Sequence, residues 1–119
     1  MMINKYGHIL EQTEIDDIEN RVNLLLKNKD FKLLSDGECH KEKAIRYKNN
    51  LRYIDLLIQK EDGLLSSWNV IDYKSSTIYD EHHLKQVRYY VKAIKEITGE
   101  EVDGYICYLL KKEVKFVKV

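Results

Sequence analysis

The sequence predicts one α/β domain over residues 1–119, with a central mixed β-sheet flanked by helices in the order α-β-β-β-α-β-β. Two segments carry apolar residues at helical spacing, and the segments between and after them are short apolar runs separated by turn residues. A chain of 119 residues is long enough for one compact domain with a modest core. Helices and strands that follow each other in this order form a sheet covered by helices on both faces.

The two expected helices are marked by apolar stripes and by residues typical of helix ends. The first is expected over residues 13–28, with Thr13 as its N-cap and a stripe of Ile15, Ile18, Val22, Leu25 and Leu26. Asp80 is expected to cap the second helix, which ends at Gly99 and has a stripe of Leu84, Val87, Val91, Ile94 and Ile97. Residues 1–12 either extend the first helix or form a separate helical turn, and residues 30–34 form a short turn of helix.

Turn signals separate the expected strands. Asn49-Asn50 predicts a hairpin turn between strands at 44–48 and 51–58, because asparagine tolerates a positive φ. Glu61-Asp62-Gly63 predicts a second hairpin, followed by a strand from about Trp68 to Lys74. Two further strands are expected at 104–110 and 114–119. If the third and fourth strands are parallel neighbours, the helix between them forms a right-handed crossover.

Composition narrows the classes of function. Lys plus Arg and Asp plus Glu each number 20, so no global basic field indicates a nucleic-acid partner, although a local basic patch is compatible with this balance. Cys39 and Cys107 lie far apart without CxxC spacing, so this chain alone builds neither a zinc site nor a cysteine-ligated iron–sulfur cluster. The sequence shows no signal peptide and no long apolar segment, which predicts a cytoplasmic protein with no membrane partner.

Three charged residues lie in or at the end of the most apolar runs. Asp55 interrupts one run, and Asp72 and Lys74 end the next. Side chains at i and i+2 leave the same face of a strand, so Asp72 and Lys74 stand side by side, and a buried acid needs a partner such as a divalent cation. This trio suits phosphodiester hydrolysis by a metal-activated water. The spacing alone is equally compatible with surface ion pairs.

Four motifs in sequence order carry a resemblance to a known family. They are His8 with Ile9-Leu10-Glu11, then Ile54-Asp55, Val70-Ile71-Asp72-Tyr73-Lys74-Ser75 and Gln86-Val87-Arg88-Tyr89-Tyr90. From about residue 7 onward the chain resembles RecB-type nucleases of the PD-(D/E)xK superfamily. It is most similar to the C-terminal nuclease domain of AddA-like helicase-nucleases. Two positions depart from the family pattern: Arg52 stands where glycine is usual, and Ile54 replaces the proline of the superfamily name.

The resemblance implies a restriction-endonuclease-like core and a Mg²⁺- or Mn²⁺-dependent deoxyribonuclease, more narrowly an exonuclease of DNA repair or recombination. It implies that Asp55, Asp72 and Lys74 are catalytic and that Gln86 and Tyr90 position the substrate. The implied metal ligands are His8, Asp55, Asp72 and the backbone carbonyl of Tyr73, with Glu42 as a further candidate. The implied partners are DNA, either single-stranded or at duplex ends, and a helicase subunit or domain. The four cysteines of the iron–sulfur relatives are absent, so that cofactor is not carried over.

Other interpretations of the same residues stay open. The chain could be a non-catalytic DNA-binding or docking domain of a helicase-nuclease complex, or a structure-specific endonuclease such as a junction resolvase. His8 and Glu42 could simply be exposed, and Gln86 with Tyr90 could be ordinary boundary residues. His82 and His83 are adjacent on a helix, so they point in different directions and are not expected to form a metal pair.

Overall fold

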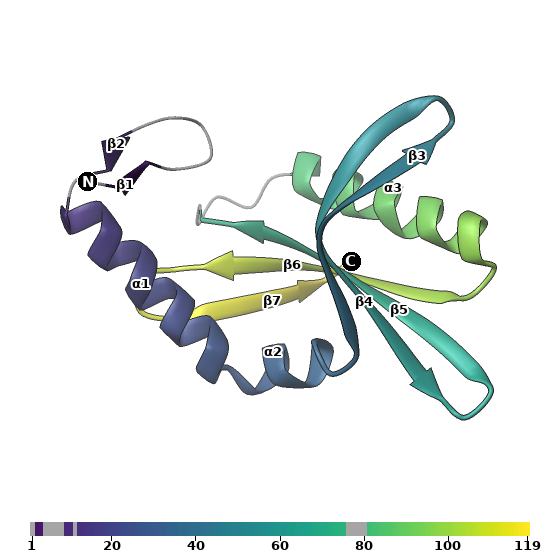
Figure 1. Cartoon of the computed structure of the whole chain (residues 1–119), viewed down its shortest axis with the longest axis horizontal. Helices are drawn as coiled ribbons and strands as arrows, with labels where there is room; N and C mark the ends of the chain where they lie inside the picture. The colour runs from purple at the N-terminus through teal and green to yellow at the C-terminus, as the bar shows by residue number, and fades with distance from the viewer. Residues whose placement is uncertain (1, 4–8, 11, 76–80) are drawn as a thin grey trace.

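The computed structural model describes residues 2–3, 9–10, 12–75 and 81–119. Its larger sheet has five strands in the order β3-β4-β5-β6-β7, and β5 and β6 are its parallel pair (Figure 1). The strands are β3 (Glu38–Tyr47), β4 (Asn50–Asp62), β5 (Leu65–Lys74), β6 (Glu101–Leu109) and β7 (Val114–Lys118). The remaining elements are β1 (Met2–Ile3), β2 (Ile9–Leu10), α1 (Gln12–Lys27), α2 (Lys29–Leu34) and α3 (Glu81–Thr98).

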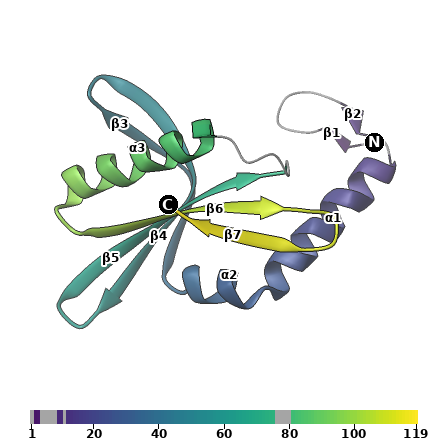
Figure 2. The same ribbon diagram turned by 180° about the vertical axis from the view of Figure 1, so that it is seen from behind.

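Helices cover the two faces of this sheet. Figures 1 and 2 show α3 on one side and α1 with α2 on the other. Between α3 and the sheet lies a core that includes Ile54, Val70, Tyr90 and Ile94, and the opposite face buries a second cluster around Ile58, Ile71 and Cys107. The expected α/β class with a mixed sheet between helices is therefore confirmed, and it is compatible with a restriction-endonuclease-like core.

Helix α3 connects the parallel strands β5 and β6 and lies against both of them. It ends at Gly99 as expected: this residue has a φ of 70°, and its N–H donates to the Lys95 carbonyl at 2.8 Å. Gly104 of β6 lies under α3, where a Cβ would come within 2.6 Å of Val87 Cγ1 and Val91 Cγ2. The glycine thus lets the helix lie close to the strand. The expected cap Asp80 falls outside the described residues.

Three expectations about the first half of the chain are wrong in detail. Met2–Ile3 and Ile9–Leu10 form a two-stranded antiparallel pair, where helix was expected. Helix α1 already begins at Gln12, so Thr13 lies inside its first turn and is not the N-cap. The first hairpin turns at Lys48 and Asn49, whose φ values are 49° and 64°, because Tyr47 pairs with Asn50. Two successive positive φ values match the twist of the strands on either side.

The apolar stripe of α1 is only partly used. Leu25 is buried, but Ile18, Val22 and Leu26 are exposed. The helix contacts β6 and β7 at the side of the sheet, so a narrow line of residues meets the core. Among the described residues, no helix has both the length and the apolar character needed to cross a membrane.

Candidate functional site

The candidate site lies where the strands β4 and β5 part. Their ladder ends at the pair Leu56 and Ile71, so the next residues facing each other in this register are Asp55 and Asp72. Side chains directly opposite each other on antiparallel strands have Cβ atoms about 4.5–5.5 Å apart. Asp55 Oδ2 accepts a hydrogen bond from the backbone N–H of Tyr73 at 2.9 Å, which takes the place of a ladder bond. The two carboxyl groups therefore share the opening between the strands.

Asp72 is a buried acid in an unfavourable environment. It is 4% exposed, and its Oδ2 lies 3.1 Å from Lys74 Nζ but has no well-formed hydrogen bond within the described part of the chain. Burial, and next the hydrogen-bonded carboxyl of Asp55, raise the pKa of Asp72 from 3.8 to about 6, although Lys74 acts in the opposite direction. Lys74 thus pairs with Asp72, and the carboxyl group of Asp55 is a second acid beside it.

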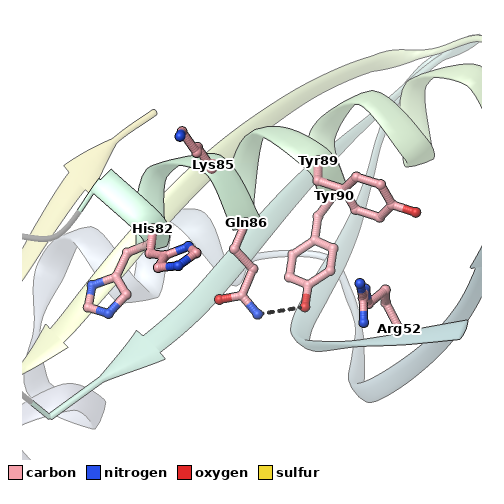
Figure 3. A pocket seen from close by; sticks show the side chains of 7 residues that line it. Arg52, His82, Lys85, Gln86, Tyr89 and Tyr90 are labelled. Atoms are coloured by element: carbon pink, nitrogen blue, oxygen red, sulfur yellow. Dashed lines mark hydrogen bonds between the residues drawn. The ribbon is translucent and has the colours of Figure 1, made fainter. Parts of the chain in front are cut away.

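A hydrogen-bonded chain links this acid pair to helix α3. Lys74 Nζ donates to Gln86 Oε1 at 3.4 Å, and Gln86 Nε2 donates to the Tyr90 hydroxyl at 3.0 Å (Figure 3). Gln86 and Tyr90 are one helical turn apart, so both side chains lie on the same side of α3. Tyr90 is buried, and this burial raises its pKa, so its hydroxyl stays neutral. These hydrogen bonds restrict where the ammonium group of Lys74 can lie.

Two hollows open beside the site. One, of about 540 Å³, is lined by Lys41, Glu42, Asp55, Leu56 and Tyr73. The other, of about 480 Å³, lies along α3 and is lined by Gln86, Tyr89, Tyr90, Arg52, Lys85, His82 and His83 (Figure 3). Asp55 lines the first hollow. Gln86 lines the second hollow and is hydrogen-bonded to both Lys74 and Tyr90. Both hollows are large enough for a small polar ligand.

The structure brings together five of the residues selected from the sequence, namely Asp55, Asp72, Lys74, Gln86 and Tyr90. His8 falls outside the described residues, so its role as a ligand stays a prediction. The Tyr73 backbone lies beside Asp55 through its N–H, and the role of its carbonyl stays a prediction as well. In the parts of the chain that the structure describes, no three His, Cys, Asp or Glu side chains converge as a metal-binding group.

Glu42 has an unusual place beside this site. The register of β3 and β4 puts it opposite Asp55, yet this pair is missing from the ladder, and Glu42 has a φ of 48°. A left-handed backbone at a non-glycine residue costs about 1–3 kcal/mol, and such strain is often found at functional sites. The side chains of Glu42 and Asp55 line the same hollow. Its candidacy as a further acidic ligand stays a prediction.

Arg52 is a site residue that the sequence motifs do not predict, because in the sequence it differs only as a departure from the family pattern. In the structure its side chain lines the hollow along α3, next to Tyr90 (Figure 3). A signal was present in the sequence, because Arg52 lies two residues before Ile54 and so leaves the same face of a strand.

Comparison with known proteins supports the fold. A crystal structure from Eubacterium rectale, described as a "Putative exonuclease", superposes with a TM-score of 0.61 at 13% identity, over 98% of this chain and 48% of that chain. The protein SSO0001 gives a TM-score of 0.44 at 14% identity, over 92% of this chain and 52% of that chain, which is too distant to carry an argument. No family model and no curated protein matches the sequence.

The chain therefore spans about half the length of the solved structures that it resembles. At 13% identity the likeness to the Eubacterium rectale protein extends to the fold and not to the activity. The activity has to be argued from the residues of this chain.

Proposed function

We propose that this chain is a metal-dependent deoxyribonuclease domain that hydrolyses phosphodiester bonds by means of a metal-activated water. The observation that carries the proposal is the opposition of Asp55 and Asp72 at the parting of β4 and β5, with Lys74 Nζ 3.1 Å from a buried oxygen of Asp72. Two adjacent carboxyl groups with one poorly satisfied buried oxygen match the oxygen ligands that Mg²⁺ and Mn²⁺ prefer. The donor set therefore fits such an ion.

Each residue has a role that follows from its place. Asp55 and Asp72 would hold the ion, and His8, the Tyr73 carbonyl and Glu42 are the candidates to complete its shell. A bound divalent ion lowers the pKa of a coordinated water and neutralises charge on a phosphate oxygen. Lys74 orients the attacking water or stabilises charge that develops on the phosphate. Gln86 and Tyr90 keep Lys74 in position and face the substrate strand.

The narrower proposal is a RecB-type exonuclease of the PD-(D/E)xK superfamily that acts in DNA repair or recombination, most similar to the nuclease domain of AddA-like helicase-nucleases. It is supported by the four motifs in order and by the likeness in fold to the Eubacterium rectale protein. DNA, single-stranded or at duplex ends, is then the substrate, and a helicase subunit or domain is a partner.

Cleavage of labelled DNA tests the proposal. Single-stranded, double-stranded and circular DNA are incubated with the protein in Mg²⁺, Mn²⁺ or EDTA. We expect cleavage in Mg²⁺ or Mn²⁺ that disappears in EDTA, and a loss of about 100-fold or more in Asp72→Asn and Lys74→Ala. Asp62→Asn is the matched control, because Asp62 is an exposed acid at the other end of β4.

The substrates separate the alternatives. Digestion of linear but not circular DNA supports an exonuclease, whereas cleavage of a four-way junction by a dimer supports a resolvase. If the wild-type protein binds DNA but cleaves none of these substrates with either metal, the nuclease proposal is wrong and a docking domain is favoured.

A further inference from the structure

The chain has no net charge, but its cations are unevenly distributed. The β3–β4 hairpin from residue 41 to 53 and the part of α3 from residue 81 to 96 contain nine Lys or Arg residues and three acids. The nine cations are Lys41, Lys43, Arg46, Lys48, Arg52, Lys85, Arg88, Lys92 and Lys95. Figures 1 and 2 show this hairpin beside α3, and Tyr47 of β3 holds it there through hydrogen bonds with Glu96 and Tyr89. The two elements together therefore concentrate positive charge in one part of the molecule.

Acids are few among these nine cations, because the two segments contain only Glu42, Glu81 and Glu96. Within the described ranges, none of these cations forms an ion pair with a carboxylate, whereas Arg21 and Lys118 elsewhere are paired with Asp17 and Asp103. Local positive potential on a neutral chain favours a polyanionic partner. The hollow along α3 takes lining residues from both elements, among them the cations Arg52 and Lys85.

Arg52 is the hairpin residue that reaches into this hollow. It pairs across the sheet with Ile45 and lies two residues before Ile54, and both of these side chains are buried toward α3. The side chain of Arg52 therefore leaves β4 on the α3 face, next to Tyr90 (Figure 3). Arg46 is also an exposed cation on the same hairpin, but it alternates with Ile45 and Tyr47 and so faces the other way.

The opposite wall of the hollow is held rigid. The hydroxyl of Tyr89 donates to the Tyr47 carbonyl at 3.1 Å, and the two rings meet edge to face with centroids 5.6 Å apart. An aromatic wall beside a guanidinium group suits a nucleotide, because the guanidinium binds phosphate oxygens in a bidentate manner and the ring contacts the sugar or base. The hollow of about 480 Å³ lies within the usual range for small-ligand sites.

We propose that Arg52 binds a phosphate group of a nucleic-acid strand in the hollow between the β3–β4 hairpin and α3. This subsite adjoins the acid pair. Gln86 and Tyr90 line the hollow, Gln86 is hydrogen-bonded to Lys74, and Lys74 is paired with Asp72. The inference rests on the proposed nuclease function, for which it supplies the path of the strand. The phosphate is either an internal phosphodiester or a terminal phosphate.

The test measures binding without cleavage. Fluorescence anisotropy of a labelled oligothymidylate is recorded in EDTA over a range of salt concentrations, for the wild type, Arg52→Ala, Arg52→Lys and Arg46→Ala. We expect Arg52→Ala to bind about tenfold more weakly and to reduce the slope of log Kd against log salt by about 0.7, the value for one phosphate contact on a single strand. Arg52→Lys keeps the slope but not the full affinity, because a lysine contacts phosphate as a point charge.

Arg46→Ala is the matched control, since it removes the same charge from the other face of the hairpin. We expect it to change binding less than about twofold, with thermal unfolding showing that all variants are folded. If Arg52→Ala binds like the wild type, or if Arg46→Ala weakens binding equally, the subsite does not exist and only the general charge matters.

Competition and cleavage separate the remaining outcomes. Circular single-stranded DNA that competes as well as linear DNA identifies an internal phosphodiester, and competition that depends on a 5′- or 3′-phosphorylated end identifies a terminal phosphate; either result supports the subsite. Selective loss of binding in Arg52→Ala together with no cleavage in any metal supports the subsite and refutes the nuclease. Metal-dependent cleavage by the wild type with unchanged binding in Arg52→Ala supports the nuclease and refutes the subsite.

Discussion

Neutralising Asp72 is expected to make the metal-free protein more stable, while it removes the proposed activity. The acid is 4% exposed and faces a second carboxyl group, so its ionised form is disfavoured in the folded state. Asparagine has nearly the same shape as aspartate but no charge. Asp72→Asn therefore removes the unfavourable ionisation and keeps the packing of β5.

The size of this effect follows from the pKa. A rise from 3.8 to about 6 corresponds to an upper limit of about 3 kcal/mol in favour of the protonated form. The nearby hollow admits water and screens the charges, so about 1–2 kcal/mol is expected at neutral pH. The pKa of Asp72 is higher in the folded state than in the unfolded state. The free energy of unfolding of the wild type therefore falls as the pH rises from about 4 through 6.

Thermal unfolding in EDTA between pH 4 and 8 measures the difference. At pH 7 the midpoint of Asp72→Asn should lie about 4–8 °C above that of the wild type, and the two should converge near pH 4. The control Asp103→Asn removes an exposed acid that lies 3.6 Å from Lys118 Nζ, and its midpoint should stay close to that of the wild type. A lower midpoint for Asp72→Asn would refute the reasoning, because it would show that the charge of Asp72 stabilises the fold through Lys74.

Three further predictions concern the ion, the chain to α3 and the packing of α3. Saturating Mn²⁺ should stabilise the wild type by about 2.7 kcal/mol at a hundredfold excess over Kd and so raise its unfolding midpoint, but it should not affect Asp72→Asn; equal midpoint shifts in calorimetry would exclude Asp72 as a ligand. Gln86→Ala should lower kcat about tenfold with little change in KM or thermal stability, since it frees Lys74; a change confined to KM would contradict this role. Gly104→Ala should cost about 1–3 kcal/mol in urea unfolding, because the new Cβ meets Val87 and Val91 at 2.6 Å, and an unchanged midpoint would show that α3 can shift freely.

Local patterns were sufficient to predict the order of the main elements. The α3 helix, its end at Gly99 and the five strands of the larger sheet agree with the sequence, because periodicity and turn residues act over a few positions. The helix at α1 was also predicted, but the burial of its stripe was not. Whether Ile18 and Val22 are covered depends on which strands lie beneath the helix, and this is a property of the whole fold.

The sequence by itself determined that Asp72 and Lys74 share a face, since side chains alternate along a strand. Only the tertiary structure decided that Asp55 faces Asp72, because this depends on the register of β4 against β5 and on the point where their ladder ends. The tertiary structure also decided that Arg52 lines one hollow with Tyr89 and Tyr90, because this depends on how the hairpin lies against α3. Contacts between distant segments follow from the packing of the whole sheet, and no local pattern encodes them.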